Sequence, residues 1–359
     1  MCQNRIGVEG MPKTGIGVTV IRKEANDKVT GCAKYTDDFH SVGVLTAWIV
    51  TSTCAHGKIK KIDSDAAAAL TGVRAIVTGE DCPLAGSLLE DRPPLAREKV
   101  RYYGEPVAIV VADNEKAAAQ AAFSIRVEYE PLPVLNSPSE ALQSGAVLVH
   151  ENLGSYKKMV TDIYPEPGTN LCDRKQIRKG NVQQGFAKSA VVVEGQFTLP
   201  QSDHIAMETR AAQAKIDADG TVFIRTSSQS PHGVKKQVST VFGLDEGKVV
   251  VEVPFVGGGF GGKAPIQLEL LAYMDSRAVG VREVRILHSR ENDMVTSPQK
   301  LGLEATIKIG VDKDGTINAT YGFIRHLPIK RHIPLCSYVA PAYLTLHIIA
   351  LVLESGGSM

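Results

Sequence analysis

The chain has 359 residues, enough for two or three domains, and its 40 basic side chains nearly balance its 39 acidic ones. The resulting formal net charge of +1 excludes a general electrostatic attraction to nucleic acid or to an anionic membrane surface. Hydrophobic residues make up 43% and charged residues 22% of the chain, which is typical of a soluble globular protein.

The cysteines and the N-terminus indicate a cytoplasmic protein. Six cysteines are scattered along the chain without a C-x-x-C spacing, which fits a reducing compartment and argues against an iron–sulfur or zinc framework. The first residues are not followed by the apolar segment that a secretory signal contains. The longest apolar run, Ala340–Leu353, is too short to span a bilayer.

The first part of the chain mixes predicted strands with a predicted helix. Short apolar runs bounded by Gly, Pro or Asp predict buried strands over Leu45–Thr51 and Val107–Val111. An alanine-rich stretch predicts a helix over Asn114–Ala122 that Asn114 caps, and Ser124–Tyr129 alternates as a half-buried strand does. This mixture predicts a compact α+β domain over residues 1–142.

Residues 143–185 are polar and interrupted by breaks such as Pro165–Gly168, so they are predicted to form a linker. From Ala190 onward the strand content rises, and Asp217–Gly220 is typical of a hairpin turn. The predicted strands here are Val191–Glu194, Ala212–Asp217, Thr221–Thr226 and Val249–Val253.

Residues 257–262 form a glycine loop, Gly-Gly-Gly-Phe-Gly-Gly, between a β-rich run and a helix predicted over Ile266–Ala278. Glycine tolerates positive φ and lets the backbone approach a ligand with no Cβ between them. Adjacent N–H groups in such a loop, beside a helix N-terminus, can bind an anion. The sequence therefore predicts that this loop holds a phosphorylated or oxyanionic group.

Three other interpretations of the glycine loop remain open. A dinucleotide-binding pattern fits residues 257–262, with Arg282–Leu287 as the second strand and Glu291 as the acid. A Walker pattern fits as far as Lys263, but Ala264 stands where a Mg²⁺-binding Ser or Thr belongs. The third interpretation is a turn without a ligand, in which glycine is needed only for close packing.

A second informative segment contains His204 and Glu208. Their spacing of four would place both on one face of a helix, as in a pair of metal ligands, although no third ligand is evident. Structural hydrogen bonding is the alternative. Gln229, in the run Ser227–His232, offers a carbonyl and an amide, which suit an oxygen- and nitrogen-rich ligand.

The glycine loop with Lys263 resembles the pterin-binding loop of the molybdenum hydroxylases, the xanthine dehydrogenase and aldehyde oxidase family. Shorter phrases resemble the same family in their order and spacing, among them Lys28–Tyr35, Arg101–Ala108 and Tyr129–Val134. The resemblance covers roughly residues 15–323. It implies an α+β protein with a hammerhead-like α/β domain (1–142), a linker (143–185) and a partial first molybdopterin-binding domain (186–323).

The resemblance also implies where the cofactor binds. The loop would present its backbone to the metal end of the pterin, and Gln229 would lie nearby, together with Gln201 or Ser202. No residue of this chain is expected to ligate the metal. The predicted cofactor-binding residues are Gln201, Ser202, Gln229, Gly258, Gly259, Phe260 and Gly261.

Family membership would imply a molybdenum–molybdopterin cofactor, with the cytosine dinucleotide form as one option. The expected reaction is oxidation of an aldehyde or a purine-like N-heterocycle with water as the oxygen source, assisted by a glutamate base. Iron–sulfur clusters and FAD would lie on partner chains, because nothing in this chain resembles their domains.

After Phe323 the resemblance stops, and residues 324–359 form a tail of uncertain register. The phrase that carries the family's glutamate base does not occur in this sequence, so the catalytic residue is unknown and the isolated chain is expected to be inactive. A C-terminal molybdopterin-binding half is then an expected partner. The alternatives are a non-catalytic pterin-binding or assembly subunit and an inactive truncated product.

Overall fold

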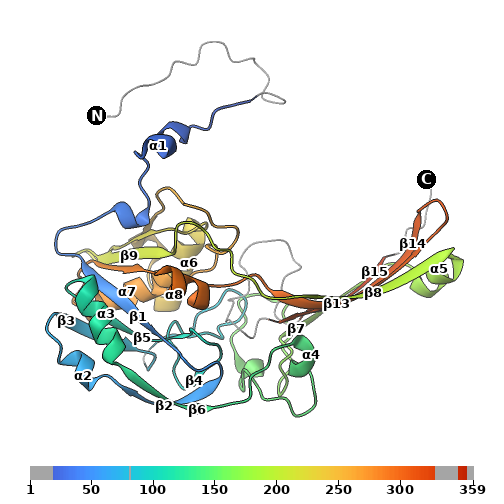
Figure 1. Ribbon diagram of the computed structural model, residues 1–359, viewed down its shortest axis with the longest axis horizontal. Coiled ribbons are helices and arrows are strands. Elements are labelled where there is room, and N and C mark those ends of the chain that lie inside the picture. Colours follow the sequence, from blue (N-terminus) through green and yellow to red (C-terminus); the bar gives the residue numbers. More distant parts are fainter. Residues whose placement is uncertain (1–18, 81, 328–346, 354–359) are drawn as a thin grey trace.

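The computed structural model describes residues 19–80, 82–327 and 347–353. A seven-stranded sheet lies in the body of the molecule and takes its strands from both halves of the chain (Figure 1). In spatial order they are β11 (Val249–Glu252), β10 (Val222–Thr226), β9 (Ala211–Ile216), β12 (Val284–Leu287), β1 (Leu45–Thr51), β5 (Pro106–Ala112) and β3 (Val73–Thr78). Because β12 pairs in parallel with β1, the two predicted domains share one sheet.

Two helices cover opposite faces of this sheet. All residues of β5 are buried, as its uninterrupted apolar run predicts. Ile109 and Val111 point toward α7 (Leu268–Ala278), whereas Ala108 and Val110 pack with α3 (Glu115–Ser124). As predicted, Asn114 caps α3, where its side chain accepts a hydrogen bond from the Ala117 N–H at 3.0 Å.

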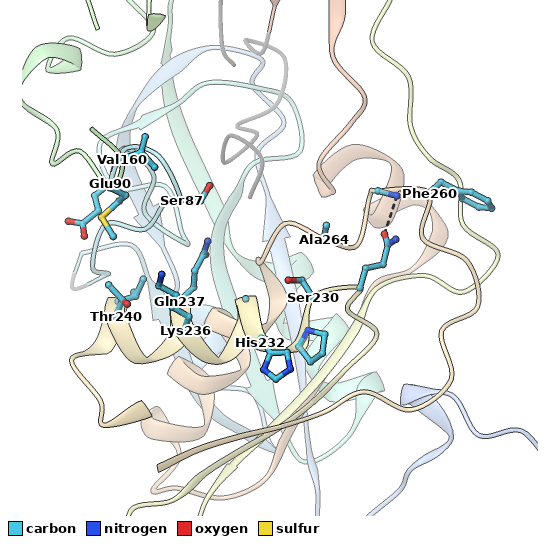
Figure 2. Close-up of a pocket in the computed structure, with 17 residues that line it drawn as sticks. Ser87, Glu90, Val160, Ser230, His232, Lys236, Gln237, Thr240, Phe260 and Ala264 are labelled. Atoms are coloured by element: carbon cyan, nitrogen blue, oxygen red, sulfur yellow. Dashed lines mark hydrogen bonds between the residues drawn. The ribbon is translucent and has the colours of Figure 1, made fainter. Parts of the chain in front are cut away.

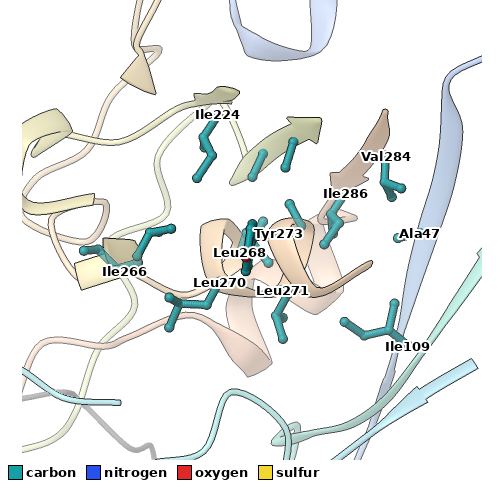
Figure 3. Close-up of a cluster of buried hydrophobic side chains, with 14 of the residues drawn as sticks. Ala47, Ile109, Ile224, Ile266, Leu268, Leu270, Leu271, Tyr273, Val284 and Ile286 are labelled. Atoms are coloured by element: carbon teal, nitrogen blue, oxygen red, sulfur yellow. The ribbon is translucent and has the colours of Figure 1, made fainter. Parts of the chain in front are cut away.

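The largest hydrophobic core lies around α7, and residues from both halves of the chain form it (Figure 3). Leu271 of α7 is fully buried in this cluster, and Ile224 and Ile286 reach the same cluster from β10 and β12. α6 (Pro231–Phe242) packs beside β11 and contacts α7. This packing fixes the segment between β11 and α7, which contains the glycine loop.

A smaller sheet of β4 (Lys99–Val100), β2 (Gly57–Asp63) and β6 (Arg126–Pro131) completes the first part of the chain. The short helices there are α1 (Ala25–Thr30) and α2 (Asp65–Ala68). α8 (Arg290–Thr296) follows β12. No helix in the described ranges is both long enough and apolar enough to cross a membrane.

A five-stranded sheet projects from the body as an arm (Figure 1). Its order is β7 (Asp173–Arg178), β15 (His347–Leu353), β14 (Ile317–Leu327), β13 (Gly302–Val311) and β8 (Val191–Leu199). The predicted linker contains β7 and most of α5 (Val182–Lys188), and α4 (Pro138–Ala141) precedes it. Of the tail, residues 324–327 continue β14 and 347–353 pair between β14 and β7; the rest lies outside the described residues.

Asp275 of α7 is a buried acid in the core. Neither carboxylate oxygen has a hydrogen-bond partner among the described residues, and burial raises the pKa of Asp275 well above its ordinary value. An unfolded aspartate titrates near about 3.9, so above that pH the unfolded chain loses a proton that the native chain retains. The free energy of unfolding therefore falls with rising pH up to the native pKa.

Asp275→Asn should remove this pH dependence. We expect the stability of the variant, relative to the original chain, to rise between pH 4.5 and 7, as measured by urea unfolding. The exposed Glu246→Gln change removes one acid without altering a buried site and serves as the control. A relative stability of Asp275→Asn that stays constant across this pH range would contradict the prediction.

Candidate functional site

Three glycines of the loop lie where a side chain from elsewhere occupies the space of a Cβ. A Cβ atom closer than about 3.0 Å to another heavy atom is not tolerated, so a larger residue would displace the loop or its support. Close packing therefore explains why glycine is needed at these three positions. A Cβ would lie 2.5 Å from Glu208 Cβ at Gly257, 2.4 Å from Gln229 Cδ at Gly259 and 2.7 Å from His204 Cγ at Gly262.

The other two glycines are needed for their backbone conformation. Gly258 has a φ of +97° and Gly261 a φ of +89°, in the region that residues with a Cβ rarely adopt. Phe260, between them, has a φ of +51° although it is not glycine, and its side chain is 74% exposed. Such strain in an exposed aromatic residue at a loop tip is typical of functional sites.

The backbone N–H groups of the loop divide into two sets. The N–H of Gly257 donates to Glu208 Oε2 at 2.8 Å, and the N–H of Gly261 donates to Gln229 Oε1 at 3.1 Å. In contrast, the N–H groups of Gly258, Gly259 and Phe260 donate to no atom of the described structure. Consecutive free donors in a loop with positive φ values are the kind of backbone arrangement that can bind an anion.

Lys263 lies behind the loop and not at its ligand-facing side. Its Nζ is 2.6 Å from Glu208 Oε2, and the lysine and glutamate side chains are only 4% and 15% exposed. Burial lowers the pKa of Lys263, and Glu208 opposes that change. Because the ammonium group points into the protein, it cannot hold a phosphate at the loop, and the Walker interpretation is wrong.

The dinucleotide-binding interpretation is also wrong. It requires β11 and β12 to be parallel neighbours joined by α7. In the seven-stranded sheet β10 and β9 separate them, and β9 runs antiparallel to both β10 and β12. Glu291, the expected acid, is an exposed residue of α8.

His204 and Glu208 do not form a pair of metal ligands. Residues 200–210 contain no helix, so the spacing of four does not place the two side chains on one face. The His204 ring lies beneath Gly262, and burial lowers its pKa. Within the described residues, no group of three or more His, Cys, Asp or Glu side chains could hold a metal.

Sequence reasoning missed a buried polar cluster beneath the same segment. Arg210 is 6% exposed, and its guanidinium donates to the Pro265 carbonyl at 3.1 Å. Burial alone would raise the pKa of Asp293, but hydrogen bonds from His288 and Ser297 lower it to about 2. The nearest sequence signal is the run Ser289–Met294, in which no pattern distinguishes Asp293 from its neighbours.

Arg290 fixes the segment that carries His204. Its guanidinium donates to the carbonyls of Ala206 and Met207 at 2.6 and 2.9 Å. The start of α8 is therefore joined to the irregular segment that supports the glycine loop. Arg290 is a structural residue in this position.

A cavity of about 970 Å³ opens beside the loop, and we call it the α6 cavity (Figure 2). Gln229, Phe260 and Gly261 line it, so the structure brings three of the seven predicted site residues to this cavity. The other lining residues are Gly86, Ser87, Glu90, Met159, Val160, Ser230, Pro231, His232, Gly233, Lys236, Gln237, Thr240, Val241 and Ala264.

The other four predicted site residues, Gly258, Gly259, Gln201 and Ser202, do not line the α6 cavity. Gln201 lines a second cavity of about 580 Å³, together with residues of β8 and β13. Ser202 forms a backbone bridge with Lys300.

Comparisons with known proteins identify the family of this chain. Residues 30–133 match the aldehyde oxidase and xanthine dehydrogenase a/b hammerhead domain, and residues 163–324 match the molybdopterin cofactor-binding domain. The chain is 33% identical over 311 residues to the xanthine dehydrogenase molybdenum-binding subunit of Escherichia coli O157:H7, covering 83% of this chain and 39% of that protein.

Two further proteins extend the comparison. The nicotinate dehydrogenase large molybdopterin subunit of Eubacterium barkeri is 27% identical, over 85% of this chain and 68% of its own length. The crystal structure of quinoline 2-oxidoreductase from Pseudomonas putida 86 superposes with a TM-score of 0.77 at 30% identity, covering 88% of this chain and 41% of that one.

The chain belongs to the molybdenum hydroxylase family, and its α+β fold is that of the hammerhead and molybdopterin-binding domains. It spans about two fifths of the length of the first curated relatives that it matches.

Proposed function

We propose that this chain forms part of the molybdopterin site of an enzyme that oxidises an aldehyde or an N-heterocycle, with water as the oxygen source. The observation that carries the proposal is the row of free N–H groups at Gly258, Gly259 and Phe260, beside a cavity large enough for a small organic molecule. These donors suit the oxyanionic metal end of a molybdenum–molybdopterin cofactor.

The residues around the loop fit that cofactor without ligating the metal. Gln229 Oε1 is occupied by the loop N–H groups of Gly261 and Lys263, so its Nε2 group remains free to donate toward a bound oxygen. Gly261 contributes its conformation and not its N–H group. When bound, the cofactor would supply the two-electron redox chemistry, in a plain molybdopterin or a cytosine dinucleotide form.

Among the described residues, the carboxylates that lie nearest the loop core, Glu208 and Glu269, already accept hydrogen bonds. Glu208 accepts from Lys263 and from the N–H of Gly257. Glu269 is 4% exposed and accepts from Thr226 Oγ1 at 2.7 Å and from the N–H of Gln267 at 3.0 Å. A general base must reach the reacting proton, so we place it on a C-terminal molybdopterin-binding half that adjoins this site.

An exposed apolar face on the arm is further support for the proposal that a C-terminal molybdopterin-binding half binds this chain. The side chains of Val193, Phe197 and Leu199 of β8 are 62%, 54% and 54% exposed. Their cross-strand neighbours on the same face are apolar too: Ile309, Ala305 and Leu303 of β13. α5 covers the opposite face, where Phe186 packs near Gly310. Contiguous exposed apolar side chains are typical of a protein–protein contact.

Electron transfer requires further partners. No described group of side chains in this chain resembles a cluster site, so iron–sulfur and FAD components would lie on other chains or segments. We place the assembly in the cytoplasm, because the scattered cysteines fit a reducing compartment.

The engaged state of Glu208 and Glu269 also favours a second candidate, a pterin-binding or assembly subunit that performs no chemistry itself. Both candidates predict a chain that is inactive by itself. They differ in the turnover expected once the second half is added.

The test is expression in a host that makes molybdopterin, with and without the C-terminal half of a relative's large subunit and its electron-transfer chains. We expect molybdenum, pterin and aldehyde- or heterocycle-dependent dye reduction only when all are present. Metal and pterin without turnover in the complete assembly would favour the non-catalytic candidate. Steady turnover by the isolated, metal-loaded chain would contradict the assignment of the base to another segment.

A further inference from the structure

One face of α6 forms a wall of the α6 cavity and carries an ammonium group. His232, Lys236 and Thr240 follow one another at intervals of four, so they share one side of the helix. Figure 2 shows Lys236 and Thr240 on the side of α6 that faces Ser87 and Glu90. Lys236 forms no hydrogen bond or ion pair with another described residue.

No opposing acid neutralises Lys236. Among the described residues that line the cavity, Glu90 is the one carboxylate. Its Oε1 is 2.8 Å from the Nζ of Lys157, which satisfies its charge from outside the cavity lining. The cavity is therefore left with one uncompensated positive charge, and an organic anion would restore neutrality.

The N-terminus of α6 adds to the positive electrostatic potential of the cavity. The helix begins at Pro231, and the Ser230 side chain forms no capping hydrogen bond. The positive end of the helix dipole consequently faces the cavity, near Gln229 and the glycine loop. Lys236 lies about 8 Å further along the helix axis, given a rise of about 1.5 Å per residue. That separation suits a ligand about one aromatic ring in length.

We propose that the α6 cavity binds the oxyanion group of an organic ligand, and that Lys236 is its specificity-determining residue. Resting on the proposed function, the favoured source of the oxyanion is a carboxylate on an aromatic substrate whose other end reaches the glycine loop. A phosphate group of the cofactor has the same chemistry and is the second source to be separated by experiment.

The test is isothermal titration of the purified chain with benzoate, with its neutral analogue benzamide, and with pyrophosphate. In the original chain we expect benzoate to bind at least 10-fold more tightly than benzamide. Lys236→Gln should remove that preference and leave benzamide binding unchanged. Lys235→Gln is the matched control, because it removes an equal charge from the neighbouring position, which does not line the cavity.

Equal binding of benzoate and benzamide, or equal weakening in both lysine variants, would overturn the proposal, as would the absence of binding by every anion. Tighter, Lys236-dependent binding of pyrophosphate would keep the oxyanion site and assign it to the cofactor's phosphate; tighter benzoate assigns it to the substrate. These titrations need no cofactor, so their failure leaves the molybdopterin assignment standing. That assignment is tested separately by metal and pterin content.

Discussion

Gly259→Val is expected to reduce the molybdopterin content of the assembled enzyme to background. A Cβ at this position would lie 2.4 Å from Cδ of Gln229, so valine must push either the loop or Gln229 away. Displacement would break the hydrogen bonds from the N–H groups of Gly261 and Lys263 to Gln229 Oε1. It would also misalign the three free N–H groups that we propose bind the cofactor. The measurement is pterin fluorescence and molybdenum content per chain.

Two variants separate this steric cause from general damage. Gly247→Val changes an exposed glycine of a turn whose nearest contact is the side chain of Asp245, and it should leave cofactor content unchanged. Gly259→Ala combined with Gln229→Ala removes the clashing atoms, so it should recover thermal stability without recovering the cofactor. Normal pterin content in Gly259→Val would contradict the assignment of the loop as the cofactor site.

Local sequence patterns predicted the elements around the site well. The strand at Leu45–Thr51 has the predicted bounds, and the helix after Asn114 starts where its cap predicts. The loop itself was predictable because few sequences other than a constrained turn need five glycines in six positions. Its neighbours, β11 and α7, follow from the alternating and apolar runs on either side.

The supports of the loop could not be predicted from the sequence, because they depend on contacts between distant segments. Gln229 is separated from Gly261 by 32 residues, and Glu208 from Lys263 by 55. The Walker pattern is purely local, so it reproduces the order of the residues but not the direction in which Lys263 points. That direction is decided by a buried carboxylate, which offers the ammonium group a partner that the loop does not.

Local sequence patterns could not predict the seven-stranded sheet that the two halves of the chain share. Parallel pairing of Leu45 with Val284 joins strands more than two hundred residues apart, and no periodicity records which strands become neighbours. The predicted linker contains regular secondary structure that the sequence did not predict, for the same reason. Its polar β7 is paired along its length in the arm, although its sequence lacks the apolar alternation typical of a strand.

Lys263→Ala is expected to destabilise the chain by about 3 to 5 kcal/mol, the usual cost of breaking a buried ion pair by removal of one partner. The variant leaves Glu208, 15% exposed, with only the N–H of Gly257 as a partner for its shared oxygen. A buried carboxylate that has lost its counter-ion is costly unless water reaches it, and the entry of water would move the start of the loop. Urea unfolding at pH 7 measures the loss.

The double variant Lys263→Met with Glu208→Gln should recover most of that stability, because no unpaired charge remains beneath the loop. The matched control is Lys248→Ala, which breaks the ion pair between Lys248 and Asp219. The side chains of these two residues are 47% and 62% exposed, so the control should change the urea unfolding midpoint little. Unchanged stability in Lys263→Ala, together with a thermal shift of the original chain by ATP, would return the lysine to the ligand-facing side of the loop. In the structure Lys263 Nζ lies 2.6 Å from Glu208 Oε2, where it cannot reach a phosphate at the loop. That result would contradict this ion pair, and the cofactor would then have to be sought among nucleotides.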